Sequence, residues 1–137
     1  MSINEIQDEL IEEFELFDDW EGKYEYLIDL GKKLNSYPEE KKDEDHIIKG
    51  CQSLVWLDAE FKDGKINFLG DSEAIIVKGL ISMLIRVLSG QIPSDILNAE
   101  LYFIDKIGMS SHLAQTRSNG LASMVKQMKA YALAHLN

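Results

Sequence analysis

The sequence predicts an α+β fold in which helices pack against one small antiparallel sheet. Apolar residues recur at helical spacing on both sides of a central segment, residues 46–69. That segment is rich in β-branched and aromatic residues, and it contains a hairpin signal. The 137 residues show no repeat and no change of composition that would mark a linker. We therefore expect a single domain, residues 1–137.

Two helices are predicted before the central segment. Residues 3–17 carry apolar side chains at steps of three and four, with carboxylates on the opposite face. A second helix is expected over residues 20–34, and it ends before Tyr37-Pro38, because the residue preceding a proline avoids the helical region. The run 39–45 mixes charges without any apolar period, and we expect it to be a solvated loop.

The central segment is expected to form two or three antiparallel strands. Residues 46–49 are a candidate short strand, and residues 53–61 are a stronger one because apolar and polar residues tend to alternate there. Residues 65–69 would return beside it, since Asp63-Gly64 is a strong hairpin signal. The prediction is a three-stranded sheet with helices on one face.

Helices are predicted again after the sheet. Asp71 or Ser72 is expected to cap a long helix whose apolar face runs to Leu88. Further helical segments are expected at residues 93–97, 101–107 and 118–136. Gly108 is expected to close the second of these three segments.

The charge distribution narrows the classes of partner. The net charge is −10, and the first 21 residues hold nine carboxylates with no lysine or arginine. Such a surface repels phosphate backbones and anionic lipids, so neither nucleic acid nor membrane is an expected partner. No stretch approaches the ~18 apolar residues of a membrane span, and the N-terminus does not resemble a secretory signal. We expect a cytoplasmic protein.

Cys51 is the only cysteine. A lone thiol excludes an internal disulfide and any metal site built mainly on thiolates. Gly50 precedes it between two strand-like segments, so a tight turn with Cys51 at its tip is feasible. Residue chemistry alone leaves two interpretations open, a buried packing residue and a reactive thiol.

No base for nucleophilic catalysis is evident near Cys51 in the sequence. His46, His112 and His135 are isolated, and neither a cysteine-protease signature nor a Cys-x-x-Cys pair is present. Lys49 and Arg117 are better candidates, because a nearby cation stabilises a thiolate. There is no glycine-rich phosphate loop and no dinucleotide fingerprint.

Four segments, taken together and in this order, resemble the signature blocks of the SufE family of sulfur acceptors in iron–sulfur cluster assembly. The segments are residues 17–31, 48–57 (IKGCQSLVWL), 70–80 (GDSEAIIVKGL) and 116–121 (TRSNGL). Two departures stand out. Glu73 replaces the usual aspartate, and Ala114-Gln115 occupy the place where a proline is common.

The resemblance implies an IscU-like α+β fold, with Cys51 as the sulfur acceptor on a loop sheltered by apolar neighbours. It maps the family's conserved arginine onto Arg117, and Gly50, Gln52 and Asp71 are expected to support the site. It implies a SufS-type cysteine desulfurase as partner and a SufBCD-like scaffold as the receiver of sulfur. Pyridoxal phosphate would belong to the desulfurase, so this chain should bind no cofactor and no metal. It would be a carrier and activator without turnover of its own, as a monomer or a homodimer.

One thiol is enough for such a relay. The Cys51 thiolate would attack the outer sulfur of a persulfide, and a second thiol nearby could release that sulfur by forming a disulfide. Burial protects a thiol but weakens it as a nucleophile, so we expect a movable loop with Gly50 as hinge. The alternatives are a stand-alone thiol peroxidase or hydrolase, a structural adaptor, and an iron–sulfur scaffold, which would need about three cysteine ligands.

Overall fold

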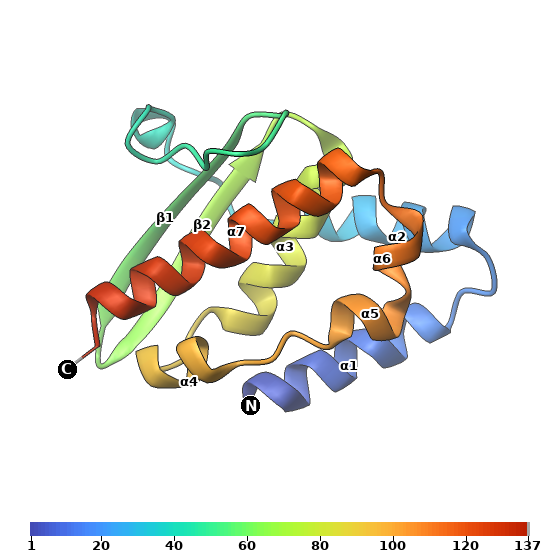
Figure 1. The fold of residues 1–137 in the computed structure, drawn as a ribbon, viewed down its shortest axis with the longest axis horizontal. Coiled ribbons are helices and arrows are strands. Elements are labelled where there is room, and N and C mark those ends of the chain that lie inside the picture. The colour runs from blue at the N-terminus through green and yellow to red at the C-terminus, as the bar shows by residue number, and fades with distance from the viewer. Residues whose placement is uncertain (137) are drawn as a thin grey trace.

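The computed structural model describes residues 1–136 and confirms the α+β class. Seven helices and two strands occur in these residues (Figure 1). In chain order they are α1 (Ile3–Glu15), α2 (Trp20–Lys32), a 3-10 turn (Glu39–Lys41), β1 (Val55–Lys62), β2 (Lys65–Ser72), α3 (Ile75–Leu88), α4 (Pro93–Asn98), α5 (Phe103–Ile107), α6 (Met109–His112) and α7 (Gln115–Ala134).

Strands β1 and β2 form an antiparallel hairpin whose register runs from Val55 opposite Ser72 to Lys62 opposite Lys65. The turn was predicted correctly. Asp63 and Gly64 both have positive φ, +54° and +77°, which matches the twist of the flanking strands. β2 is longer than expected, because it continues to Ser72 rather than ending at residue 69.

The predicted third strand is wrong, because residues 46–48 form only an isolated bridge to β1. Two backbone hydrogen bonds make it, from Ile48 N to Val55 O at 2.8 Å and from Leu57 N to His46 O at 2.9 Å. A turn at 44–46 precedes this stretch, and another turn begins at Lys49. The stretch between the turns is therefore too short to be a strand.

Helix α3 occupies the centre of the molecule (Figure 1). Nine of its side chains or backbone positions are buried, and it contacts α1, α2, β2 and α7. Its closest approach is to α2, where two glycines let the backbones meet. A Cβ added at Gly79 would lie 2.4 Å from Leu27 O, and one at Gly31 would lie 2.8 Å from Gly79 N. The two helices pack this closely only because neither position has a side chain.

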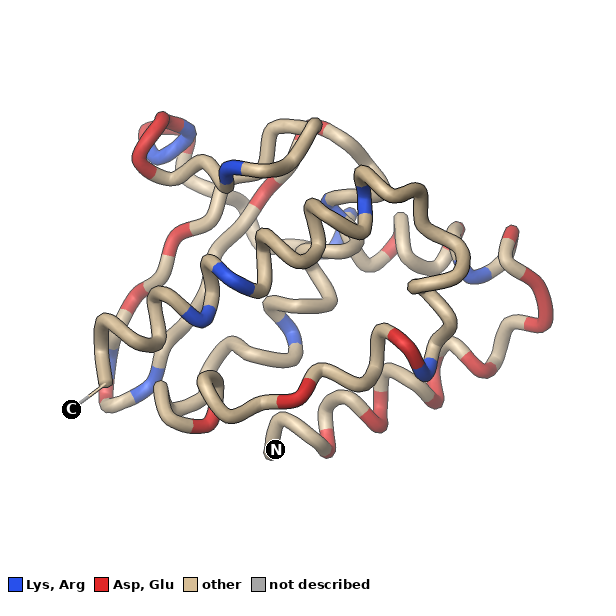
Figure 2. Tube along the Cα trace, viewed as in Figure 1, with Lys and Arg blue, Asp and Glu red and all other residues tan. Residues whose placement is uncertain are grey.

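The acidic first helix is attached to this centre by both apolar and charged contacts. Leu10 and Phe14 of α1 are buried in the core. On the rim, Arg86 of α3 donates to Glu13 at 2.9 Å and pairs with Glu9 at 2.6 Å. Figure 2 shows the remaining carboxylates along the outer side of α1.

The charged run 39–45 is largely exposed, as expected of a solvated loop, but two of its lysines are paired with the sheet. Lys41 pairs with the largely buried Asp58 of β1 at 2.6 Å, and Lys42 pairs with Asp71 of β2 at 3.1 Å. Lys42 also lies 5.2 Å from the centre of the Trp56 ring. These ion pairs hold the run against the sheet, because each strand carries a carboxylate within reach of one of the lysines.

The predicted cap of the long helix is also wrong. Helix α3 begins at Ile75 after Ala74, and Asp71 and Ser72 belong to β2. Ser72 still assists the turn, since its hydroxyl donates to Leu54 O at 2.7 Å and accepts from Ala74 N at 3.3 Å. The strand pairing with Val55 therefore overrides the local capping preference.

The C-terminal helices differ from expectation mainly in their boundaries. Gly108 closes α5 with a φ of +94°, as predicted. The short α6 was not predicted, and α7 begins at Gln115 rather than near residue 118. Arg117 consequently lies within the first turn of α7.

The α2–α3 contact predicts a strong effect of a single methyl group. Gly79→Ala should lower the free energy of unfolding by about 3 kcal/mol, the upper part of the overpacking range, because its Cβ would meet backbone rather than a movable side chain. Urea denaturation would measure this. Gly22→Ala in α2 is the matched control, since its nearest neighbours are the side chains of Asp19 and Phe17. Equal effects of both changes would contradict the proposed packing constraint.

Candidate functional site

Cys51 lies on a loop, residues 49–54, whose base is the hydrogen bond between Ile48 and Val55. Gly50 has a φ of +94°, which confirms the tight turn expected before the cysteine. The loop rests on the N-terminal half of α7, where the Cys51 thiol donates to Gly120 O at 3.6 Å. The thiol is neither fully buried nor freely exposed.

A cavity of about 250 Å³ opens beside the thiol. Its lining comes from the cysteine loop, α3, Ala114 and the N-terminal half of α7. The residues are Cys51, Gln52, Ser53, Val77, Ala114, Thr116, Arg117, Gly120 and Met124. The structure thus brings together the predicted residues Cys51, Gln52 and Arg117, with Gly50 adjacent to them. Their functional roles stay predictions.

Asp71, the remaining predicted supporting residue, is not part of this cavity lining. It lies in β2 and pairs with Lys42 at 3.1 Å and with Lys78 at 3.3 Å. Burial raises the pKa of Asp71, but hydrogen bonds from Lys42, the Ser72 amide and Lys78 outweigh it, so the pKa lies below its usual value. The ionised carboxylate joins the run 39–45 to β2 and α3.

Within residues 1–136, no histidine lines the cavity. His46 lies 2.7 Å from Asp43 and 3.5 Å from Asp58, His112 stacks on Trp20, and His135 stacks on Phe61. Lys49, a candidate for stabilising the thiolate, lines a neighbouring depression instead. This leaves Arg117 as the cationic side chain that borders the thiol's cavity.

Burial raises the pKa of the Cys51 thiol above its usual value. The thiol is therefore protonated at neutral pH, and a protonated thiol is a poor nucleophile. Arg117 is exposed and lies within the same cavity lining. With the loop in this position the Cys51 thiol is partly shielded from water, and its raised pKa disfavours the reactive thiolate.

The lining residues that the sequence did not indicate as site residues are Ser53, Val77, Ala114, Thr116, Gly120 and Met124. No local property distinguishes Val77 or Met124, because each fits an ordinary apolar helix face. Their signal was indirect, since each lies in or just after a segment that resembles the family's signature blocks. Only the fold shows that these segments meet at one cavity.

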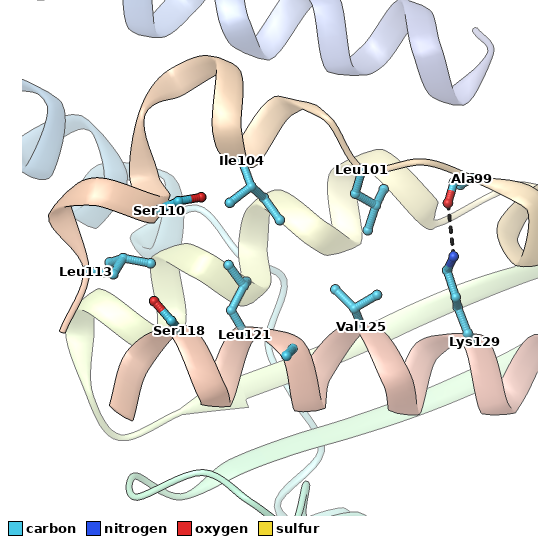
Figure 3. A pocket seen from close by; sticks show the side chains of 10 residues that line it. Ala99, Leu101, Ile104, Ser110, Leu113, Ser118, Leu121, Val125 and Lys129 are labelled. Atoms are coloured by element: carbon cyan, nitrogen blue, oxygen red, sulfur yellow. Dashed lines mark hydrogen bonds between the residues drawn. The ribbon is translucent and has the colours of Figure 1, made fainter. Parts of the chain in front are cut away.

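A larger groove, of about 570 Å³, lies on the opposite side of α7's N-terminal half (Figure 3). Leu101 and Ile104 point across it toward Leu121 and Val125. Its one charged lining residue, Lys129, donates to Ala99 O at 2.9 Å. The groove contains no nucleophilic thiol and no acid–base pair, so the smaller cavity at Cys51 is the better candidate for chemistry.

No three histidine, cysteine, aspartate or glutamate side chains in residues 1–136 gather closely enough to hold a metal ion. None of the helices in that part of the chain combines the length and apolar character needed to span a bilayer.

Comparison with known proteins relates most of the chain to one family. The family profile described as SufE, Fe-S metabolism associated domain, matches residues 8–132. A SufE-like protein of Rhizobium meliloti is 39% identical over 132 residues, covering 91% of this chain and 93% of its own length. A SufE-like protein of Synechocystis is 37% identical, covering 91% of this chain and 79% of its own length.

The fold is shared with a more distant protein. The solution structure of a hypothetical protein from Thermus thermophilus superposes with a TM-score of 0.78 at 20% identity. The match covers 95% of each chain. At this level of identity the similarity supports the architecture alone.

The burial of Cys51 predicts a measurable pH dependence. The rate at which iodoacetamide alkylates Cys51 should rise with pH, with a midpoint above ~8.5, the pKa of an unperturbed thiol. The midpoint is higher because burial raises the pKa of this thiol in the folded protein. In urea the midpoint should return to the ordinary value. A folded midpoint at or below the urea value would contradict this description.

The raised pKa of Cys51 also fixes the direction in which the free energy of unfolding changes with pH. Because the folded pKa lies above the unfolded one, the thiol's contribution is fully present below ~8.5 and decreases as the pH rises from there through the folded pKa. Cys51→Ser should lack this component.

Proposed function

Because this chain belongs to the SufE family, a family associated with iron–sulfur metabolism, we propose that it carries sulfur on Cys51 between two proteins. The donor would be a pyridoxal-phosphate cysteine desulfurase of the SufS type, which this protein also stimulates. The receiver would be an iron–sulfur cluster scaffold of the SufBCD type. The observation that carries the proposal is the single thiol, placed on a loop at a cavity whose described lining has a cation but no histidine base.

The transfer needs only thiol exchange. The Cys51 thiolate attacks the outer sulfur of the desulfurase persulfide, and a new S–S bond forms at Cys51 as the old one breaks. The desulfurase sulfur leaves as a thiolate, so no oxidant is consumed. In the second step an acceptor thiolate attacks the outer sulfur held on Cys51, and the Cys51 thiolate is released. One cysteine completes both steps.

Movement of the cysteine loop would allow the Cys51 thiol to be protected at rest and reactive when a partner is bound. In the closed position burial raises the pKa of Cys51 and hinders its attack. Opening at Gly50, whose φ is already +94°, would bring the thiol into water, where its pKa falls. Arg117 belongs to the lining of the same cavity, where its charge can favour the thiolate as the loop opens. We propose that docking of the desulfurase opens the loop.

The surface beside the loop suggests where a partner docks. Leu54 is 43% exposed and Ile75 is 61% exposed, although both are apolar. The Ser72 hydroxyl and the Glu73 amide both donate to Leu54 O, which places Leu54 beside the turn that leads to Ile75. Exposed apolar side chains next to a reactive group are typical of an interaction surface. A desulfurase that covers Leu54 and Ile75 would bring its persulfide to Cys51.

The remaining assignments follow from this role. The chemistry on cysteine, the substrate, belongs to the desulfurase and its pyridoxal phosphate, so this chain is proposed to bind no cofactor of its own and to have no independent turnover. A thiol that must remain free favours a reducing cytoplasm. A stand-alone hydrolase would need a base beside Cys51, and no histidine in the described chain lines that cavity.

The primary experiment is a direct test of loading. The protein is incubated with a pyridoxal-phosphate cysteine desulfurase and cysteine, and its intact mass is measured. Wild type should gain sulfur, and Cys51→Ser should gain none because it has no thiol. Treatment with a reducing thiol should return the original mass, since it cleaves the persulfide. Absence of any gain with several SufS-type desulfurases would reject the proposal.

The docking surface gives a separate prediction. Ile75→Asp should slow persulfide formation on Cys51 by about tenfold at low protein concentration, because it places a charge on the apolar contact. Alkylation of Cys51 by iodoacetamide measures whether the site itself is intact. Leu16→Asp is the matched control, since Leu16 is 81% exposed but lies at the end of α1. Equal rates for the two variants would place the partner elsewhere.

A further inference from the structure

Two positions on α7 lie against the cysteine loop. At the first, Gly120, a Cβ would lie 3.4 Å from Cys51 Sγ, and the peptide oxygen accepts the thiol hydrogen bond. At the second, Ser123 Oγ would lie 2.6 Å from a Cβ placed on Gly50. The two positions are separated by three residues, so they share one face of the helix.

The residue types at these positions are those that the contact requires. Glycine in a helix interior is less favourable than alanine, yet Gly120 is a buried position of α7. It leaves room for the sulfur and access to its own carbonyl. Ser123 is small, and its hydroxyl is turned back to donate to Asn119 O at 3.1 Å. With the hydroxyl in this position there is space for the Gly50 backbone but not for a Cβ at residue 50.

We propose that Gly120 and Ser123 are positioning residues for Cys51. They form a seat on α7 that holds the cysteine loop in its closed position. The fit between Gly50 and Ser123 determines how much of the time the thiol is available for reaction. The seat itself follows from the contacts, whereas its consequence for sulfur exchange rests on the proposed function.

Helix α7 has two surfaces with different neighbours. Gly120 and Met124 face the cysteine cavity, whereas Leu121 and Val125 face the apolar groove on the other side of the helix (Figure 3). Ala122 belongs to the groove surface and is exposed. A change of size at residue 122 therefore tests the helix without touching the seat.

The first experiment enlarges the seat. In Ser123→Leu the longer side chain meets Gly50, so the loop should spend more time open. Alkylation of Cys51 by iodoacetamide at pH 7.5 should become about tenfold faster, which corresponds to about 1.4 kcal/mol. The pH midpoint of alkylation should fall toward the ordinary thiol value, because the open thiol is hydrated. Ala122→Leu, the matched control, should retain the wild-type rate and midpoint.

The second experiment uses the 2.6 Å contact itself. Gly50→Ala should accelerate alkylation, because its Cβ collides with Ser123 Oγ and because alanine is strained at this φ. In Gly50→Ala/Ser123→Ala the collision is removed, since the remaining distance to the residue 123 Cβ is 3.5 Å. The backbone strain is the same in both variants. The double variant should therefore alkylate more slowly than Gly50→Ala, a non-additive result.

The outcomes separate a seat from a general loss of structure. Thermal unfolding followed by circular dichroism identifies any variant that no longer folds, and for such a variant the Gly50 pair decides. If Ser123→Leu and Ala122→Leu alkylate at equal rates, or if the Gly50 and Ser123 effects are additive, the seat is rejected. Alkylation requires no desulfurase, so this result is independent of whether wild type accepts sulfur.

Discussion

The architecture depends on the contact between α2 and α3, where Gly31 and Gly79 allow two helix backbones to touch. This contact fixes α3 as a helix enclosed by other elements rather than one lying on the surface. From that central position α3 supplies Val77 to the cysteine cavity and Arg86 to the acidic first helix. It also supports β2, because Gly70 lets the strand approach the side chain of Ile81. Displacing α3 would therefore disturb the site and the core together.

Ion pairs between the two strands and the run 39–45 have a structural role. Asp58 and Asp71, one from each strand, hold the lysines of the run 39–45. This run leads directly into the residues that pair with β1 and then into the cysteine loop. The base of the loop is consequently fixed on both sides, by backbone hydrogen bonds to β1 and by ion pairs to the sheet. The tip, with Gly50 and Cys51, instead contacts α7, through packing and the hydrogen bond from the Cys51 thiol to Gly120 O.

Under the proposed function, the position of the cysteine loop would balance protection of the thiol against its reactivity. Partial burial raises the pKa of Cys51, which protects the thiol from oxidation and makes it slow to attack. A base fixed beside the thiol would remove that protection permanently. In the proposed function, opening of the loop would supply the thiolate only when a partner is present, with Arg117 in the same cavity lining.

The sequence by itself determined the helical periods, the Asp63-Gly64 turn and the identity of the single thiol, because each depends on neighbouring residues. It also indicated the family, since four ordered segments carry that signal together. The third strand was wrong because residues 46–48 lie between two turns, and the helix cap at Asp71 or Ser72 was wrong because both residues pair within the β1–β2 hairpin. The cavity that joins Cys51 to Arg117, and the fit of Gly50 against α7, were decided only by tertiary structure. These contacts join residues about 70 positions apart, as the separation of 69 between Cys51 and Gly120 shows, and no local pattern encodes such distances.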